Sequence, residues 1–237
     1  MADRDRPLYA VLIDADNIPA DHAEAILKEV TTFGEPALRR VYGDWSSGQL
    51  KRWSEKIRGL GLVAHQETAN TKGKNASDIG LVIDAMDILH TGRFDGFVLV
   101  SSDSDFTRLA SRIREEGLDV IGIGEGKAPE ALRNVCNRFV LIENLVETPP
   151  EAAKGASRPA GKQDPKHAIP LILRAMEKVN TDDEWCPMGP VGQYIMADNP
   201  DFDTRTYGEA KLSDLVKKLR RFETRKEGNQ LMLRRVD

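Results

Sequence analysis

The sequence predicts an α/β protein: a parallel sheet with helices on both faces, followed by a small second domain of helices and a hairpin. Three observations lead to this prediction. Short apolar runs alternate with helix-length segments over residues 1–147, which is typical of βαβ units. A stretch rich in Pro, Gly and small residues follows at 148–164, and we expect it to be an exposed linker. Residues 165–237 return to an apolar, helical pattern.

The first domain is expected to alternate strands with helices. The strands are predicted at Leu8–Ile13, Ala37–Tyr42, Leu62–Gln66, Gly96–Ser101, Asp119–Ile123 and Phe139–Ile142, and the helices near 19–33, 47–58, 76–90 and 104–116. The third helix is the clearest, because Ile79, Val82, Ile83, Met86 and Leu89 recur at helical spacing. Strands of this kind form parallel sheets, in which ligands bind at the carboxyl ends of the strands.

The second domain is expected to be a winged-helix module. Helices are predicted at 167–180, 185–195 and 203–219, and a hairpin at 222–235 turns at Gly228-Asn229. Four aromatic side chains are expected in its core: Trp185, Tyr194, Phe202 and Tyr207.

The composition excludes several classes of protein. The chain has 237 residues, of which 40% are hydrophobic and 30% charged, and a formal net charge of -4, as in soluble globular proteins. No apolar run approaches the ~20 residues of a membrane helix, and the amino terminus lacks the apolar core of a signal peptide. Cys136 and Cys186 are far apart and the four histidines do not cluster. We therefore expect no disulfide framework, no cysteine or histidine metal site, no membrane partner and a cytoplasmic location.

Acidic side chains follow the predicted strands where a site would form. Asp14 and Asn17 follow the first strand, Asp103 and Asp105 follow the fourth, and Asp78 begins the third helix. Carboxylates packed together repel one another, and Mg²⁺ or Mn²⁺ relieves this repulsion by taking oxygen ligands. Such an ion can activate water and neutralise a phosphodiester that is being cleaved.

Each of these residues also has a simpler interpretation. An Asp after a strand often forms a turn or caps the next helix, as Ser102 or Asp103 could do here. Asp78 could simply favour the helix dipole. Lys72 and Lys74 could form a solvated loop or hold a phosphate backbone. The coincidence of several acidic residues at one sheet edge favours the site.

Three segments together resemble a known family. The runs Val11–Asn17, Lys74–Asp84 and Val98–Phe106 are similar to the NYN domain, a PIN-like nuclease group that includes the LabA-like proteins. The resemblance covers about residues 7–145. It implies a Rossmann-like parallel sheet, bound Mg²⁺ or Mn²⁺, and cleavage of RNA phosphodiester bonds.

The resemblance also implies roles for single residues. By motif match, Asp14, Asp78 and Asp103 would bind the metal, Asp105 would be a further acidic residue of the catalytic set, and Asn17 would orient the first carboxylate or the substrate.

Three positions depart from this simple scheme. Asp84 lies six residues after Asp78, a spacing that points it away from the same site. Ser102 and Ser104 stand where the family often has glycine, and their hydroxyl groups could narrow access for a substrate.

The second domain resembles the OST-HTH (LOTUS) domain, which implies RNA binding and, in some members, protein partners. The similar segments are Trp185–Gly192, Tyr207-Gly208, Lys211-Leu212 and Asp214–Val216. Residues 211–235 hold nine basic and three acidic side chains, a footprint typical of nucleic-acid binding. A solvated helix end is the alternative. The candidate RNA contacts here are Lys211, Lys217, Lys218, Arg220 and Arg221.

These features favour a Mg²⁺- or Mn²⁺-dependent endoribonuclease to which the second domain delivers RNA. The alternative is a non-catalytic RNA-binding regulator that uses the first domain for partner contacts or as a homodimer. A third interpretation is a haloacid-dehalogenase-type phosphatase with Asp14 as nucleophile. It fits poorly, because Asn17-Ile18 stands where that family has Thr or Val, and no cap-domain segment is present.

Overall fold

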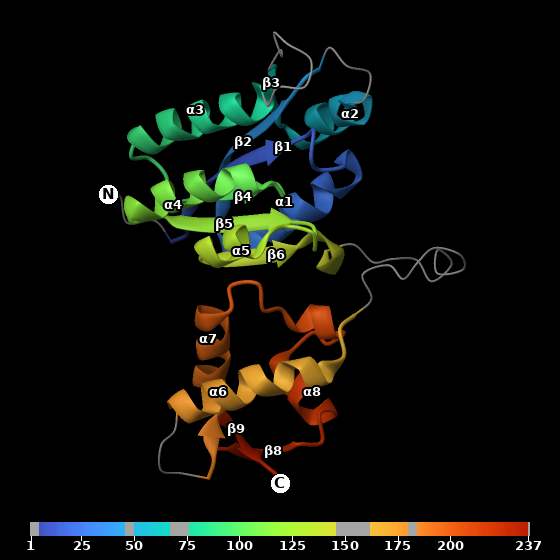
Figure 1. Cartoon of the computed structure of the whole chain (residues 1–237), viewed down its shortest axis with the longest axis vertical. Coiled ribbons are helices and arrows are strands. Elements are labelled where there is room, and N and C mark those ends of the chain that lie inside the picture. The colour runs from blue at the N-terminus through green and yellow to red at the C-terminus, as the bar shows by residue number, and fades with distance from the viewer. Residues whose placement is uncertain (1–4, 46–49, 67–75, 146–161, 180–183, 237) are drawn as a thin grey trace, which may run out of the picture. The chain divides into compact units, whose positions relative to one another are not determined.

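The computed structural model describes residues 5–45, 50–66, 76–145, 162–179 and 184–236. The chain forms two compact units, Met1–Thr148 and Pro149–Asp237, drawn in blue to yellow and in orange to red in Figure 1. Lys72, Lys74 and most of the expected linker lie outside the described residues. Within the described ranges, each helix is too short or too polar to cross a membrane.

The first unit contains a six-stranded sheet in the order β3-β2-β1-β4-β5-β6, and all of its neighbouring strands are parallel. The predicted fold class is therefore confirmed. The chain builds the sheet outward from β1 in one direction and then returns to β4 to continue in the other. The carboxyl ends of β1 and β4 flank this switch point, where open α/β sheets bind ligands. The strands are β1 (Leu8–Asp14), β2 (Glu35–Gly43), β3 (Val63–Gln66), β4 (Gly96–Val100), β5 (Asp119–Gly124) and β6 (Arg138–Leu141).

Helices cover both faces of this sheet (Figure 1). Successive residues of β1 point to opposite faces, so Val11 and Ile13 pack with α1 and α2, and Ala10 and Leu12 pack with α3, α4 and α5. The helix α5 was not predicted, because six residues are too few to show a period. The helical elements are η1 (Ala20–His22), α1 (Ala23–Phe33), α2 (Lys51–Leu60), α3 (Ala76–His90), η3 (Ser104–Phe106), α4 (Thr107–Glu115), α5 (Glu130–Val135) and η4 (Ile142–Asn144).

The helix α3 has the bounds that the sequence predicted, and one stripe of it is buried. Leu81, Ala85 and Ile88 are buried, whereas Ile79 and Ile83 are each 59% exposed. This helix is apolar on nearly every side, so its spacing could not show which stripe packs on the sheet. The contact of α3 with β1 and β2 decides which stripe is buried.

The second unit combines short helices with an antiparallel sheet in the order β7-β9-β8. Gly228 has a φ of 57° and occupies the first turn position, as a type II′ hairpin requires. Gly208, with a φ of 84°, divides the predicted helix 203–219. The elements are η6 (Pro165–Ala168), α6 (Ile169–Val179), β7 (Cys186–Pro187), α7 (Met188–Asp198), η7 (Thr204–Tyr207), α8 (Leu212–Lys218), β8 (Phe222–Glu227) and β9 (Gln230–Arg235). We call the β8–β9 hairpin the wing.

Two of the four aromatic predictions for this unit were wrong. Phe202 and Tyr207 are buried in the core, as expected, but Tyr194 is 43% exposed. Trp185 is half-buried, and the guanidinium carbons of Arg225 and Arg234 lie 4.2 and 4.8 Å from the centre of its ring. Stacking with these two cations holds the indole outside the apolar core.

Candidate active site

Three carboxylates converge beside the switch point of the sheet. Asp103 and Asp105 follow β4, and Asp78 lies in the first turn of α3. One oxygen of each lies within 4.8 Å of the others, and we call these three residues the acidic group. Asp105 is exposed and the other two are half-buried. Asp14, which the sequence also predicted as a metal ligand, is not a member of this group.

Asp14 lies at the end of β1 and is only 3% exposed. Its Oδ2 accepts a hydrogen bond from Ser101 Oγ at 2.9 Å, and its Oδ1 accepts one from the backbone N–H of Asn17 at 3.1 Å. Burial raises the pKa of Asp14 to about 6, against these two hydrogen bonds and with a further contribution from the charge of Asp78. Asp14 is thus a buried carboxyl that interacts with the acidic group through its charge.

The loop after β4 is held by its own side chains. Ser101 Oγ donates to Asp14 and accepts a hydrogen bond from the Asp103 N–H at 3.1 Å. Asp103 Oδ1 in turn accepts from the Asp105 N–H at 2.9 Å and so caps η3. The capping interpretation of Asp103 is therefore confirmed, and the same cap brings Asp105 next to Asp103.

Asn17 joins the loops that follow β1 and β4. Its backbone N–H contacts Asp14, and its side-chain oxygen accepts from the Ser102 N–H at 3.2 Å. Ser102 is buried, and its hydroxyl accepts from the Glu125 N–H at 2.9 Å. The expectation that this hydroxyl narrows access was therefore wrong. Ser104, by contrast, is exposed.

Asp78 carries the electrostatic signature of the site. Burial raises its pKa, and the charges of Asp103, Asp105 and Asp16 raise it further. Asp16 was not predicted as a site residue, although its position two residues after Asp14 was a usable signal. Half-buried carboxylates that repel one another and offer only oxygen atoms fit a hard divalent cation.

Asp84 belongs to a different set of contacts. Six positions along a helix turn by about 600°, which places Asp84 about 240° from Asp78 on the opposite flank. There its carboxylate accepts hydrogen bonds from Arg40 and from the Tyr42 hydroxyl, both on β2. Asp84 thus fastens α3 to the sheet and helps to fix the position of Asp78.

The predicted RNA contacts of the second unit lie on and just around α8. All five are exposed: Lys211, Lys217, Lys218, Arg220 and Arg221. Lys218 Nζ lies 2.7 Å from Glu209 Oε1. The residue Arg220 has a φ of 49°, a left-handed conformation that glycine usually provides at a helix end. We call these five residues the basic set.

Comparison with known families places this geometry in context. A family model described as the NYN domain matches residues 9–143. The chain belongs to the NYN domain family. A second model, the OST-HTH/LOTUS domain, matches residues 162–231, so both predicted resemblances are confirmed. Together with the acidic group, the two matches support a nuclease role for the NYN unit and an RNA-binding role for the OST-HTH unit.

Two solved structures are similar to this chain, and the first agrees with its fold. The crystal structure of a protein of unknown function from Vibrio parahaemolyticus is 22% identical, with a TM-score of 0.51, over 60% of this chain and 96% of that one. The solution structure of an uncharacterized Nitrosomonas europaea protein is 33% identical over 38% of this chain and 90% of that one, with a TM-score of 0.28. No curated protein matches the sequence significantly.

Proposed function

We propose that the NYN unit is a Mg²⁺- or Mn²⁺-dependent endoribonuclease and that the OST-HTH unit binds its RNA substrate. The observation that carries this proposal is the acidic group, in which three carboxylates from two elements meet at the carboxyl edge of a parallel sheet. Oxygen donors gathered within 4.8 Å of one another at this edge are what metal-assisted phosphodiester cleavage needs.

The residues of the chain take separate roles in this proposal. Asp78, Asp103 and Asp105 would hold the cation, which supplies charge neutralisation and an activated water when it is bound. Asp14 adds a fourth negative charge beneath them, and the prediction that it is itself a ligand remains part of the proposal. Ser101 and Asn17 orient Asp14. Asp105, the most exposed member, faces the side from which an RNA strand approaches.

The OST-HTH unit supplies the positive charge for RNA binding that the NYN unit lacks. Residues 1–147 carry 18 basic and 24 acidic side chains, so this unit alone repels a phosphate backbone. The basic set offers the opposite charge in the same chain, and Lys72 and Lys74 are proposed to assist near the site. A protein partner of the OST-HTH unit remains a further proposal. The proposed setting is the cytoplasm, where the free thiols of Cys136 and Cys186 would stay reduced.

A homodimer is part of the proposal. The helix α3 presents Ile79 and Ile83 outward, each 59% exposed, and exposed large apolar side chains that lie close together often mark a protein interface. We expect light scattering to give twice the chain mass for the wild type and the single-chain mass for Ile83→Glu. A monomeric wild type would remove this part of the proposal alone.

The alternative function is a non-catalytic RNA-binding regulator. One observation favours it: the carboxylates of Asp14 and Asp103 already serve the fold, through Ser101 and Asn17 for the former and through the cap of η3 for the latter. In that case the acidic group would stabilise the fold or contact a protein partner.

A cleavage assay separates the two functions. Single-stranded, hairpin and duplex RNAs are incubated with the protein in Mg²⁺, Mn²⁺ or EDTA. We expect metal-dependent cleavage that falls at least about 100-fold in Asp78→Asn and Asp103→Asn. Asn still caps a helix well, so Asp103→Asn removes charge and preserves the turn. The matched control is Asp87→Asn, an exposed position of the same α3 helix, which should cleave normally. RNA binding without cleavage would favour the regulator, and cleavage that persists in EDTA would overturn the proposed metal dependence.

A further inference from the structure

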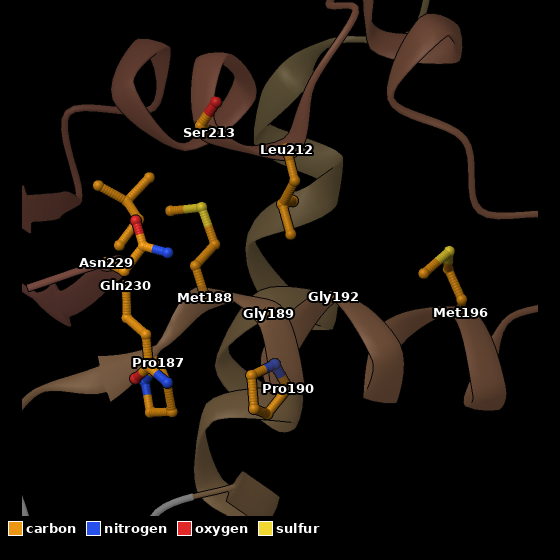
Figure 2. A pocket seen from close by; sticks show the side chains of 11 residues that line it. Pro187, Met188, Gly189, Pro190, Gly192, Met196, Leu212, Ser213, Asn229 and Gln230 are labelled. Atoms are coloured by element: carbon orange, nitrogen blue, oxygen red, sulfur yellow. The ribbon is translucent and has the colours of Figure 1, made fainter. Parts of the chain in front are cut away.

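A groove of about 500 Å³ crosses one side of the OST-HTH unit. It lies between the start of α7, the start of α8 and the turn of the wing (Figure 2). Its walls include the apolar residues Met188, Pro190 and Leu212, and Ser213, Asn229 and Gln230 contribute polar groups. None of its lining residues is charged. An apolar cleft with a few polar groups is the usual form of a site for a small planar ligand.

Glycine keeps the α7 side of the groove open. A Cβ added at Gly189 would meet no atom within 4 Å, and one at Gly192 would approach Leu212 Cδ2 to 3.2 Å. Both glycines line the groove (Figure 2). Because α7 presents backbone instead of side chains here, a flat group can approach the helix closely.

Positive charge lies on the same helix that supplies one wall of this uncharged groove. Lys211 directly precedes the lining residue Leu212, and Lys217 and Lys218 follow on the same seven-residue helix. All three are exposed. A free apolar molecule gains nothing from these cations, and an apolar peptide gains little. A nucleobase that is joined to a phosphate backbone uses the groove and the cations together.

We propose that the groove receives an unstacked base of single-stranded RNA whose phosphates lie on the basic residues of α8. Met188, Pro190 and Leu212 would contact the faces of the base, and Ser213, Asn229 and Gln230 would hydrogen-bond its edge. In duplex RNA the bases are stacked and paired, so they cannot enter such a groove. This inference rests on the proposed RNA binding and specifies its substrate class as unpaired RNA.

The test measures binding by the full-length protein in EDTA, so that cleavage does not contribute. Fluorescence anisotropy compares a labelled single-stranded RNA with an oligonucleotide of the same length whose bases have been removed. We expect Gly189→Leu, which adds a side chain where space is open, to weaken binding of the normal RNA about tenfold. The same variant should bind the abasic strand as the wild type does. The matched control is Ala197→Leu, which adds bulk at an exposed position of α7 outside the residues that line the groove, and it should bind both strands normally.

A double substitution elsewhere in the groove keeps the test informative if Gly189→Leu fails to fold. Asn229→Ala with Gln230→Ala changes two exposed positions and should reduce discrimination among A-, C-, G- and U-rich strands while affinity for the abasic strand is kept. Equal binding of normal and abasic RNA by the wild type, or a preference for duplex, would overturn the proposal. If Lys217→Ala with Lys218→Ala abolishes binding and Gly189→Leu does not, only the groove is excluded. If neither of these variants changes binding, the proposal that the OST-HTH unit binds RNA is rejected as well.

Discussion

The two units hold their charged residues in opposite ways. In the NYN unit, Asp14 is buried and Asp103 is fixed by the cap that it provides, so the position of each carboxylate follows from a strand end. In the OST-HTH unit, the basic set is exposed on a short helix and its flanks. The carboxylates of the NYN unit are therefore held in one geometry, as chemistry requires. The exposed side chains of the basic set can instead adjust to a flexible polymer.

The two arrangements also differ in their energetic cost. Burying a carboxyl group disfavours its charged form, and the pKa of about 6 for Asp14 expresses that cost. Lys218 and Glu209 pair at the surface, with side chains 55% and 21% exposed, and such a pair contributes at most about 1 kcal/mol. Substitutions should therefore change stability in the NYN unit more than in the OST-HTH unit.

The largest stability effect is expected for Asp14→Asn. The pKa of Asp14 rises from 3.8 to about 6 on folding. Between these values the folded protein binds more protons than the unfolded chain, so the free energy of unfolding falls as the pH rises through this window. At pH 7 the loss is roughly 3 kcal/mol. Asn does not ionise, so in EDTA the variant should be more stable than the wild type at pH 7.5.

Urea unfolding checks this prediction at two pH values. The stability advantage of Asp14→Asn should be largest at pH 7.5 and should shrink as the pH falls to about 3, below both pKa values, where Asp14 is mostly protonated in both states. Asp87→Asn changes an exposed carboxylate and should show no such trend. A constant difference between Asp14→Asn and the wild type across the range would contradict the assigned pKa.

A smaller effect, about 2 kcal/mol, is expected for Tyr42→Phe. The substitution removes the hydroxyl that donates to Asp84 and leaves Arg40 as the remaining contact from β2. If this contact positions α3, Mn²⁺ affinity measured by calorimetry should fall several-fold, although Tyr42 is not in the acidic group. Loss of stability with unchanged Mn²⁺ affinity would show that Asp84 serves the fold alone.

The smallest effect is expected at the edge of the basic set. Arg220 has a φ of 49°, and a left-handed conformation costs a non-glycine residue about 1 kcal/mol. Arg220→Gly should therefore stabilise the protein by up to about 1 kcal/mol in thermal unfolding. The same substitution should reduce the salt dependence of RNA binding by about one phosphate contact. Arg220→Ala should lose that contact without the gain in stability.

The sequence allowed the sheet and the edge of the site to be predicted, because apolar runs identify buried strands and acidic residues followed two of them. The sequence did not show which carboxylates lie close enough together to form the acidic group. That outcome depends on the burial of Asp14 and on the turn of η3, which brings Asp105 beside Asp103. Trp185 was misassigned for a similar reason: its neighbours Arg225 and Arg234 come from distant positions that no local pattern connects to it.

The side-chain hydrogen bonds of the loop after β4 have a consequence for its dynamics. Amide hydrogens beyond the end of a strand normally exchange with solvent quickly, because no ladder protects them. Here several such amides donate to side chains: Ser102 to Asn17, Asp103 to Ser101, Asp105 to Asp103 and Glu125 to Ser102. Their exchange must wait until these side chains separate. The rate of deuterium uptake in this loop would therefore report how often the loop beside the acidic group opens, independently of any movement in the sheet.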